Sequence, residues 1–98
     1  MSVNHYHLTV FFTATDETAA KAFVKEMEET GIAQTIRREA GCLRYDFYFD
    51  AKDPSVILLL EEWESEAHQK IHVNQPHMNE MRAVKAKYIT ATRLIPVS

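Results

Sequence analysis

The sequence of 98 residues has one cysteine, two glycines and no cluster of basic residues. A single cysteine, Cys42, cannot form an intramolecular disulfide, which fits a reducing compartment. Two isolated glycines, Gly31 and Gly41, cannot build a glycine-rich phosphate loop, so the chain has no recognisable site for a nucleotide cofactor. The net charge is −3 and the only adjacent basic pair is Arg37-Arg38, so we expect no nucleic-acid partner.

Long apolar segments are missing as well. The longest unbroken aliphatic run is Val56 to Leu60, whereas about 20 residues are needed to span a bilayer. The first residues pass straight into a strand-like pattern, without the basic and apolar regions of a signal peptide. With 46% apolar and 26% charged residues, the composition is that of a globular protein. We therefore expect one soluble, cytoplasmic domain over residues 1–98, without a membrane partner.

What the sequence does contain is a succession of strand and helix patterns. Alternating side chains predict four strands, and Thr15-Asp16-Glu17 and Ser65 supply N-caps for two helical regions. Gly31 divides the first helical region, and Asn74-Gln75-Pro76 divides the second, with Pro76 as the first residue of the following helix. The predicted strands are 4–13, 42–50, 56–64 and 88–97. This order, β-α-β-β-α-β, predicts an α+β fold of the ferredoxin-like type with an antiparallel sheet.

The third predicted strand is apolar on both faces over its first half, from Val56 to Leu60. Such a pattern is typical of a central strand that is covered on both sides. In a two-layer domain, helices cover one face of the sheet and the other face meets water. We therefore expect the second face to pack against another sheet, which predicts a homodimer formed through the sheet faces.

The first predicted strand has two unlike faces. One is uniformly apolar, whereas the other mixes histidine, threonine and phenylalanine in His7, Thr9 and Phe11. A mixed face of this kind suits a pocket or an interface better than open water. The chain is also rich in aromatic residues, and a few of them, such as Phe11 and Tyr45, would suffice to stack a planar substrate.

Two segments resemble the antibiotic biosynthesis monooxygenase family. The run Glu39-Ala40-Gly41-Cys42-Leu43-Arg44-Tyr45-Asp46 is similar to the family's E-P-G-C-L-x-Y segment at the start of the second strand. The family's second signature is matched by Glu61, Trp63, Ser65, Ala67, His72, Pro76 and His77. The departures are Ala40 in place of proline and His68 in place of an aliphatic residue.

The resemblance implies a homodimeric α+β barrel with one pocket per subunit between helices and sheet. Members of the family include cofactor-free monooxygenases of phenols and quinols, haem-degrading enzymes, and isomerases of small signalling sugars. The resemblance therefore predicts a monooxygenase that needs no cofactor and acts on a small quinol or phenolic aromatic. Two alternatives stay open because one scaffold hosts several reactions: a proton-transfer isomerase of a hydroxy-carbonyl metabolite, and a non-catalytic module that binds a small aromatic.

The candidate catalytic residues are His72, Trp63 and Glu61. Trp63 and Glu61 share one strand face, where the indole N–H and the carboxylate could orient a polar aromatic substrate. Alternatively, Trp63 is a core residue and Glu61 forms an ion pair with a nearby basic residue. A histidine titrates near neutral pH, so His72 is the first candidate for a base; alternatively, it is a surface residue. The candidate substrate-binding residues are His7, Phe11, Tyr45 and His77, the last of which could also be a core histidine.

Metal and haem sites are poorly supported by the sequence. His68 and His72 have the four-residue spacing of ligands on one helix face, but a third ligand is not evident, so we expect no metal. Haem-degrading relatives use an asparagine on the first strand, a tryptophan and a late histidine; Asn4 and Trp63 match, but the late helix offers Arg82 and Lys85 instead. Cys42 has no histidine near it in sequence, which favours a buried thiol over a nucleophile.

Overall fold

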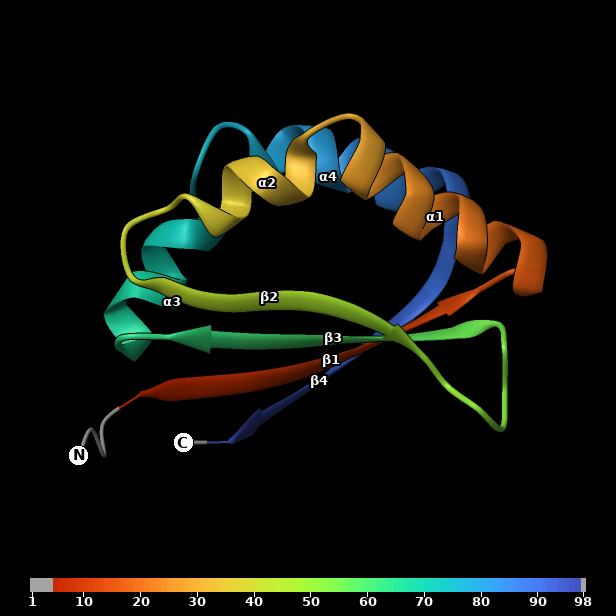
Figure 1. Cartoon of the computed structure of the whole chain (residues 1–98), viewed down its shortest axis with the longest axis horizontal. Helices are drawn as coiled ribbons and strands as arrows, with labels where there is room; N and C mark the ends of the chain where they lie inside the picture. The colour runs from red at the N-terminus through yellow and green to blue at the C-terminus, as the bar shows by residue number, and fades with distance from the viewer. Residues whose placement is uncertain (1–4, 98) are drawn as a thin grey trace.

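Four antiparallel strands form one sheet in the computed structural model, which describes residues 5–97. The sheet order is β2-β3-β1-β4, with β3 in the centre beside β1. In chain order the elements are β1 (Tyr6–Ala14), α1 (Glu17–Glu29), α2 (Ile32–Arg37), β2 (Cys42–Phe49), β3 (Val56–Trp63), α3 (Glu66–Val73), α4 (Met78–Tyr88) and β4 (Ile89–Val97) (Figure 1). The ferredoxin-like α+β fold predicted from the sequence is confirmed.

The helices begin where the sequence predicts their N-caps. The Asp16 side chain accepts a hydrogen bond of 2.8 Å from the Ala19 N–H, and Ser65 Oγ accepts one of 3.2 Å from the His68 N–H. These contacts satisfy N–H groups that have no partner within the first turn. Pro76 precedes α4 instead of opening it, because residues 75–77 form a tight turn that continues into the helix.

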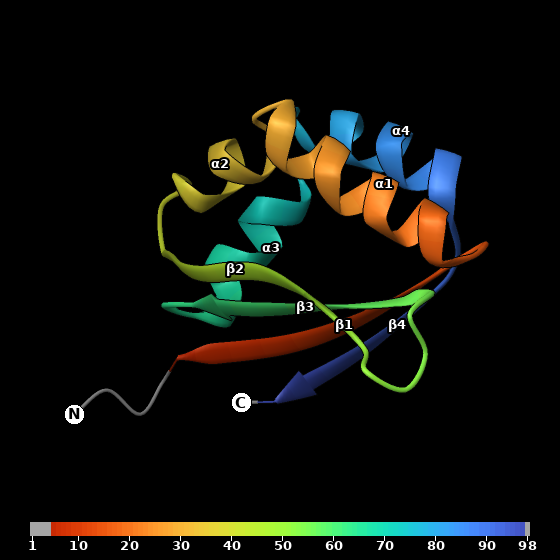
Figure 2. The same cartoon turned by 45° about the vertical axis from the view of Figure 1, so that its right-hand side comes forward.

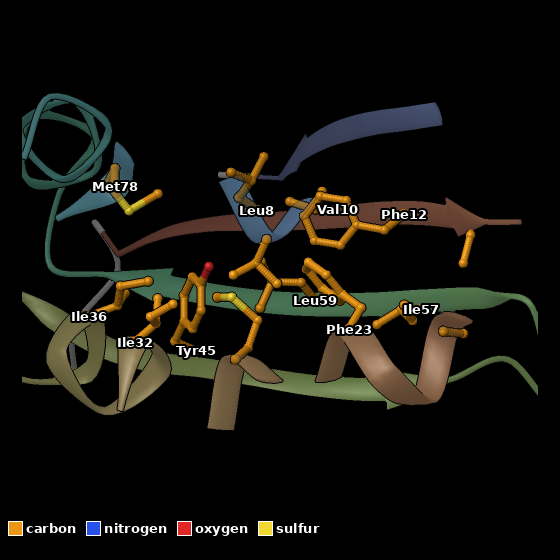
Figure 3. Close-up of a cluster of buried hydrophobic side chains, with 14 of the residues drawn as sticks. Leu8, Val10, Phe12, Phe23, Ile32, Ile36, Tyr45, Ile57, Leu59 and Met78 are labelled. Carbon is orange, nitrogen blue, oxygen red and sulfur yellow. The ribbon is translucent and has the colours of Figure 1, made fainter. Parts of the chain in front are cut away.

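All four helices cover the same face of the sheet, as both views show (Figures 1 and 2). Every second residue of β1 and β3 points toward them and is buried. Figure 3 shows Leu8, Val10 and Phe12 of β1 beside Leu59 of β3, with Phe23 of α1 packed against this cluster. A buried side chain of this size stabilises the fold by roughly 1.5–3 kcal/mol, so this face supplies the core.

The opposite face of the sheet, called here the outer face, carries the alternate residues and has no helix over it within residues 5–97. Strands β1, β3 and β4 contribute apolar side chains to this face: Phe11, Val56, Leu58, Leu60 and Ile95. The central strand is therefore apolar on both faces, as its sequence pattern indicates, but the chain itself covers only one of them.

The turn between α2 and β2 brings this part of the chain against α3. Gly41 has a φ of +81°, and a Cβ atom added there would lie 2.4 Å from Cδ2 of His68, so only glycine fits. The Glu64 N–H donates a hydrogen bond of 2.8 Å to the Gly41 carbonyl, and the Cys42 N–H donates one of 3.1 Å to the Glu39 carbonyl. This close approach places Glu39 beside the second helical region.

Candidate active site

A cavity of about 260 Å³ lies between the inner face of the sheet and the helices α3 and α4. This volume lies just below the usual range of about 300–1,000 Å³ for drug-sized ligands, so it suits a molecule of one or two rings. Most of its wall is apolar. It is lined by Leu8, Val10, Phe12, Tyr45, Leu59, Glu61, Gln69, His72, Val73, Met78, Met81, Arg82, Lys85, Thr92 and Leu94.

Glu61 is the one carboxylate among the described residues that line this cavity. Trp63, two residues further along β3, is fully buried behind the wall, and its Nε1–H donates a hydrogen bond of 2.9 Å to Glu61 Oε1. Burial raises the pKa of Glu61 to about 7, against the effect of the Trp63 hydrogen bond, and the charge of Glu39 adds to the rise. The Glu61 carboxyl group therefore exchanges its proton near neutral pH.

His72 lies on the same wall and is held on three sides. Its ring is tilted over Trp63, with the ring centres 4.6 Å apart, and meets Tyr45 edge-on at 5.9 Å. Its Nδ1 is 2.9 Å from Oε2 of Glu39. Burial lowers the pKa of His72, although Glu39 opposes this effect. The lowered pKa favours the neutral imidazole, and a carboxylate oxygen as the acceptor at Nδ1 favours the tautomer in which Nε2 keeps its lone pair.

Glu39 is a further functional candidate, and its contacts with two histidines are visible only in the structure. The same oxygen, Oε2, also lies 2.7 Å from Nε2 of His77, so one carboxylate, whose side chain is 9% exposed, contacts two histidines. His77 contacts Glu39 but does not line the cavity. Nothing local in the sequence marks this cluster, because Glu39 is separated by 33 residues from His72 and by 38 from His77.

Two predicted substrate-binding residues lie on the other side of the sheet. His7 and Phe11 alternate with Leu8, Val10 and Phe12 along β1, so they point to the outer face. His7 Nε2 is 3.9 Å from Glu62, and the Arg93 guanidinium lies 4.9 Å from the centre of the Phe11 ring. The structure brings Glu61, Tyr45 and His72 together at the cavity, but it does not bring His7 or Phe11 to them.

The remaining reactive side chains contribute structure. Burial raises the pKa of the Cys42 thiol to about 11, and the negative charges of Glu39 and Glu61 add to this, so the thiol stays protonated. His68 Nδ1 is 2.7 Å from the capping hydroxyl of Ser65. Within residues 5–97, no group of three or more histidine, cysteine or acidic side chains could hold a metal ion. Asn4 lies outside the described residues.

No helix in the described part of the chain is long and apolar enough to cross a membrane.

Comparison with known proteins points to one family. The model of the family described as "Antibiotic biosynthesis monooxygenase" matches residues 6–84. "Probable quinol monooxygenase YgiN" of Escherichia coli K12 is 34% identical over 55 residues, which cover 48% of this chain and 53% of the relative. The chain therefore matches only about half the length of this curated relative.

Solved structures share the fold at lower identity. PA3566 from Pseudomonas aeruginosa has a TM-score of 0.81 with 23% identity, covering 99% of this chain and 95% of that one. A Nitrosomonas europaea protein named for the same family has a TM-score of 0.85 with 18% identity, covering 100% and 92%. At these identities the likeness establishes the fold alone.

Proposed function

Because this chain belongs to the antibiotic biosynthesis monooxygenase family, we propose that it oxygenates a small quinol or phenol in the cavity beside α3 and α4. The observation that carries the proposal is His72, a cavity-lining imidazole whose Nδ1 is held by Glu39, on an otherwise largely apolar wall. A neutral imidazole with one nitrogen fixed by a carboxylate is a general base with a defined orientation. The name of the Escherichia coli relative supports quinols as the substrate class.

The chemistry requires an electron-rich substrate, because molecular oxygen reacts slowly with closed-shell organic molecules. His72 Nε2 accepts a proton from a phenolic hydroxyl, and the resulting anion gives electrons to oxygen. Glu39 stabilises the imidazolium that forms. For a simple quinol the product is the hydroxyquinone. One oxygen atom replaces a ring hydrogen as a hydroxyl group, the other leaves as water, and the quinol is itself oxidised to the quinone, so the substrate supplies every electron and no cofactor is needed.

The other wall residues hold the substrate. Tyr45 meets the base edge-on, and the aliphatic wall contributed by Leu8, Val10 and Leu59 excludes water. Trp63 fixes the Glu61 carboxyl group through its indole N–H, so Glu61 is placed to accept or donate a hydrogen bond to a second hydroxyl of a quinol. A dry cavity favours this arrangement because hydrogen bonds and charges act more strongly away from water.

The proposed activity predicts oxygen uptake with reduced quinols. A panel of phenols and quinols is incubated with the protein in an oxygen-electrode cell, and the product is identified by mass spectrometry. We expect one oxygen molecule consumed per substrate and a product that carries one new oxygen atom. Hydrogen peroxide formed mole for mole would contradict monooxygenation. Deuterium uptake from solvent without oxygen consumption would indicate an isomerase, and binding without any turnover would indicate a binding module.

We also propose that the protein acts as a homodimer through the outer face of the sheet. Phe11, Leu58 and Leu60 form the centre of that face, and the polar groups Glu62 and Arg93 lie around it. An apolar patch rimmed by polar residues is typical of an interface between proteins. The family resemblance supports a second copy of this chain as the partner.

The dimer predicts a mass in solution of about twice that of one chain. Leu58→Glu places a charge in the centre of the outer face, and we expect it to shift the protein to the monomer in sedimentation velocity experiments. Ile71→Glu is the matched control, because Ile71 is an exposed apolar residue of α3 away from the sheet. A wild-type monomer, or a Leu58→Glu variant that still dimerises, would contradict the proposed interface.

A further inference from the structure

One face of α4 carries cations where an amphipathic helix normally carries apolar residues. Met78, Met81, Arg82 and Lys85 follow the spacing i, i+3, i+4, i+7, and all four line the cavity. The first half of this face, Met78 and Met81, is apolar. The second half is cationic. Arg82 is exposed and Lys85 is partly buried, so burial of its charge makes an acidic partner favourable for Lys85 in particular.

Neither cation has an acidic partner within the described residues 5–97. Arg82 donates from Nη1 to Asn79 Oδ1 at 3.1 Å and from Nη2 to the Val73 carbonyl at 2.7 Å, so its guanidinium is fixed at the rim of the cavity. Three of its five N–H donors stay available. Lys87 on the same helix differs, because it is ion-paired with Glu26 and does not line the cavity.

Lys85 lies over an aromatic ring of the cavity wall. Its Nζ is 5.3 Å from the centre of the Phe12 ring, which is buried among the lining residues. Burial lowers the pKa of Lys85, and the positive charge of Arg82 lowers it further. Arg82 and Lys85 are three residues apart on one helix face and are therefore neighbours, so an anion between them would offset the repulsion of two like charges.

We propose that the cavity accepts an aromatic substrate that carries an anionic substituent, a carboxylate or a sulfonate, bound between Arg82 and Lys85. Arginine and lysine bind such groups through charge-assisted hydrogen bonds, which are stronger than neutral ones. The substrate then has two anchored ends. Its anionic group meets α4, and its hydroxyl group meets Glu61 and His72, which line the cavity from β3 and α3. The position of the hydroxyl group rests on the proposed function. The anion site does not, because it is inferred from the two cations of α4 alone.

The test uses three quinols that differ in one substituent: hydroquinone, gentisate and hydroquinone sulfonate. Binding is measured by titration calorimetry without oxygen. We expect at least one of the two anionic quinols to bind about tenfold more tightly than hydroquinone, and the comparison between them shows whether a carboxylate or a sulfonate fits better. Lys85→Met and Arg82→Met should each remove most of this preference, measured in each variant as the ratio of its affinities for the anionic quinol and for hydroquinone. Lys85→Arg should retain it.

Lys87→Met is the matched control, because it removes the same charge from the same helix outside the cavity. Equal affinity for the three quinols would overturn the proposal, as would an equal loss of anion preference in Lys87→Met and Lys85→Met. Oxygen uptake measured in parallel separates this proposal from the proposed function. A preference for anionic quinols without turnover rejects only the oxygenase activity, and turnover without any preference rejects only the anion site.

Discussion

Replacing His72 by glutamine should lower kcat/KM for quinol oxygenation by about 10²–10⁴-fold, the usual contribution of a general base. Glutamine fills a similar volume, and its amide can still donate to Glu39, but it has no basic nitrogen. The substitution therefore removes the proton acceptor while keeping the contact that orients it. The rate is measured by oxygen uptake with the best quinol of the panel, and thermal unfolding checks that the fold is intact.

His77→Gln is the matched control for this prediction. His77 contacts the same oxygen of Glu39 but does not line the cavity, so its loss removes one neighbour of the carboxylate without removing the base. We expect a decrease well below that of His72→Gln. Equal decreases in the two variants would show that both histidines act only by positioning Glu39, and the assignment of His72 as the base would be wrong.

Local patterns carried most of the fold prediction. The apolar run of Val56 to Leu60 indicates a buried strand, and Asp16 and Ser65 mark helix starts because a capping side chain acts within three residues of its own position. These signals involve residues that are close together in the sequence, so they can be recognised without knowledge of the tertiary structure. The two faces of β1 are harder to assign, since each contains phenylalanine, and the sequence alone does not say which face the helices cover.

Neighbouring site residues could be predicted from the sequence only where they belong to the same strand or helix. Glu61 and Trp63 share a face because they are two residues apart, and that spacing is visible in the sequence. Glu39 gains its role from contacts with two histidines that are 33 and 38 residues away along the chain, and no local pattern in the sequence indicates such contacts. Arg82 and Lys85 likewise become candidates for substrate binding only when the structure shows that both line the cavity.

Glu61→Gln should make the protein more stable at alkaline pH. The pKa of Glu61 rises from its ordinary value of 4.5 to about 7 on folding, so the folded state binds this proton more tightly than the unfolded state. Stability then falls as the pH rises from about 5 to 8, because the buried carboxyl group must ionise. At about 1.4 kcal/mol per pKa unit, this group destabilises the protein at pH 8 by at most about 3.5 kcal/mol.

Glutamine has nearly the shape of the protonated acid, and its amide oxygen can accept the Trp63 hydrogen bond. The difference in unfolding free energy between Glu61→Gln and wild type should therefore grow by about 2 kcal/mol between pH 5 and pH 8. Urea denaturation at both pH values and one protein concentration measures it, because a dimer's stability depends on concentration. Glu80→Gln, on the exposed side of α4, should show no such growth. If Glu61→Gln shows none either, then the Glu61 carboxyl group is hydrated in the folded protein, and the dry cavity that the oxygenase chemistry requires does not exist around it.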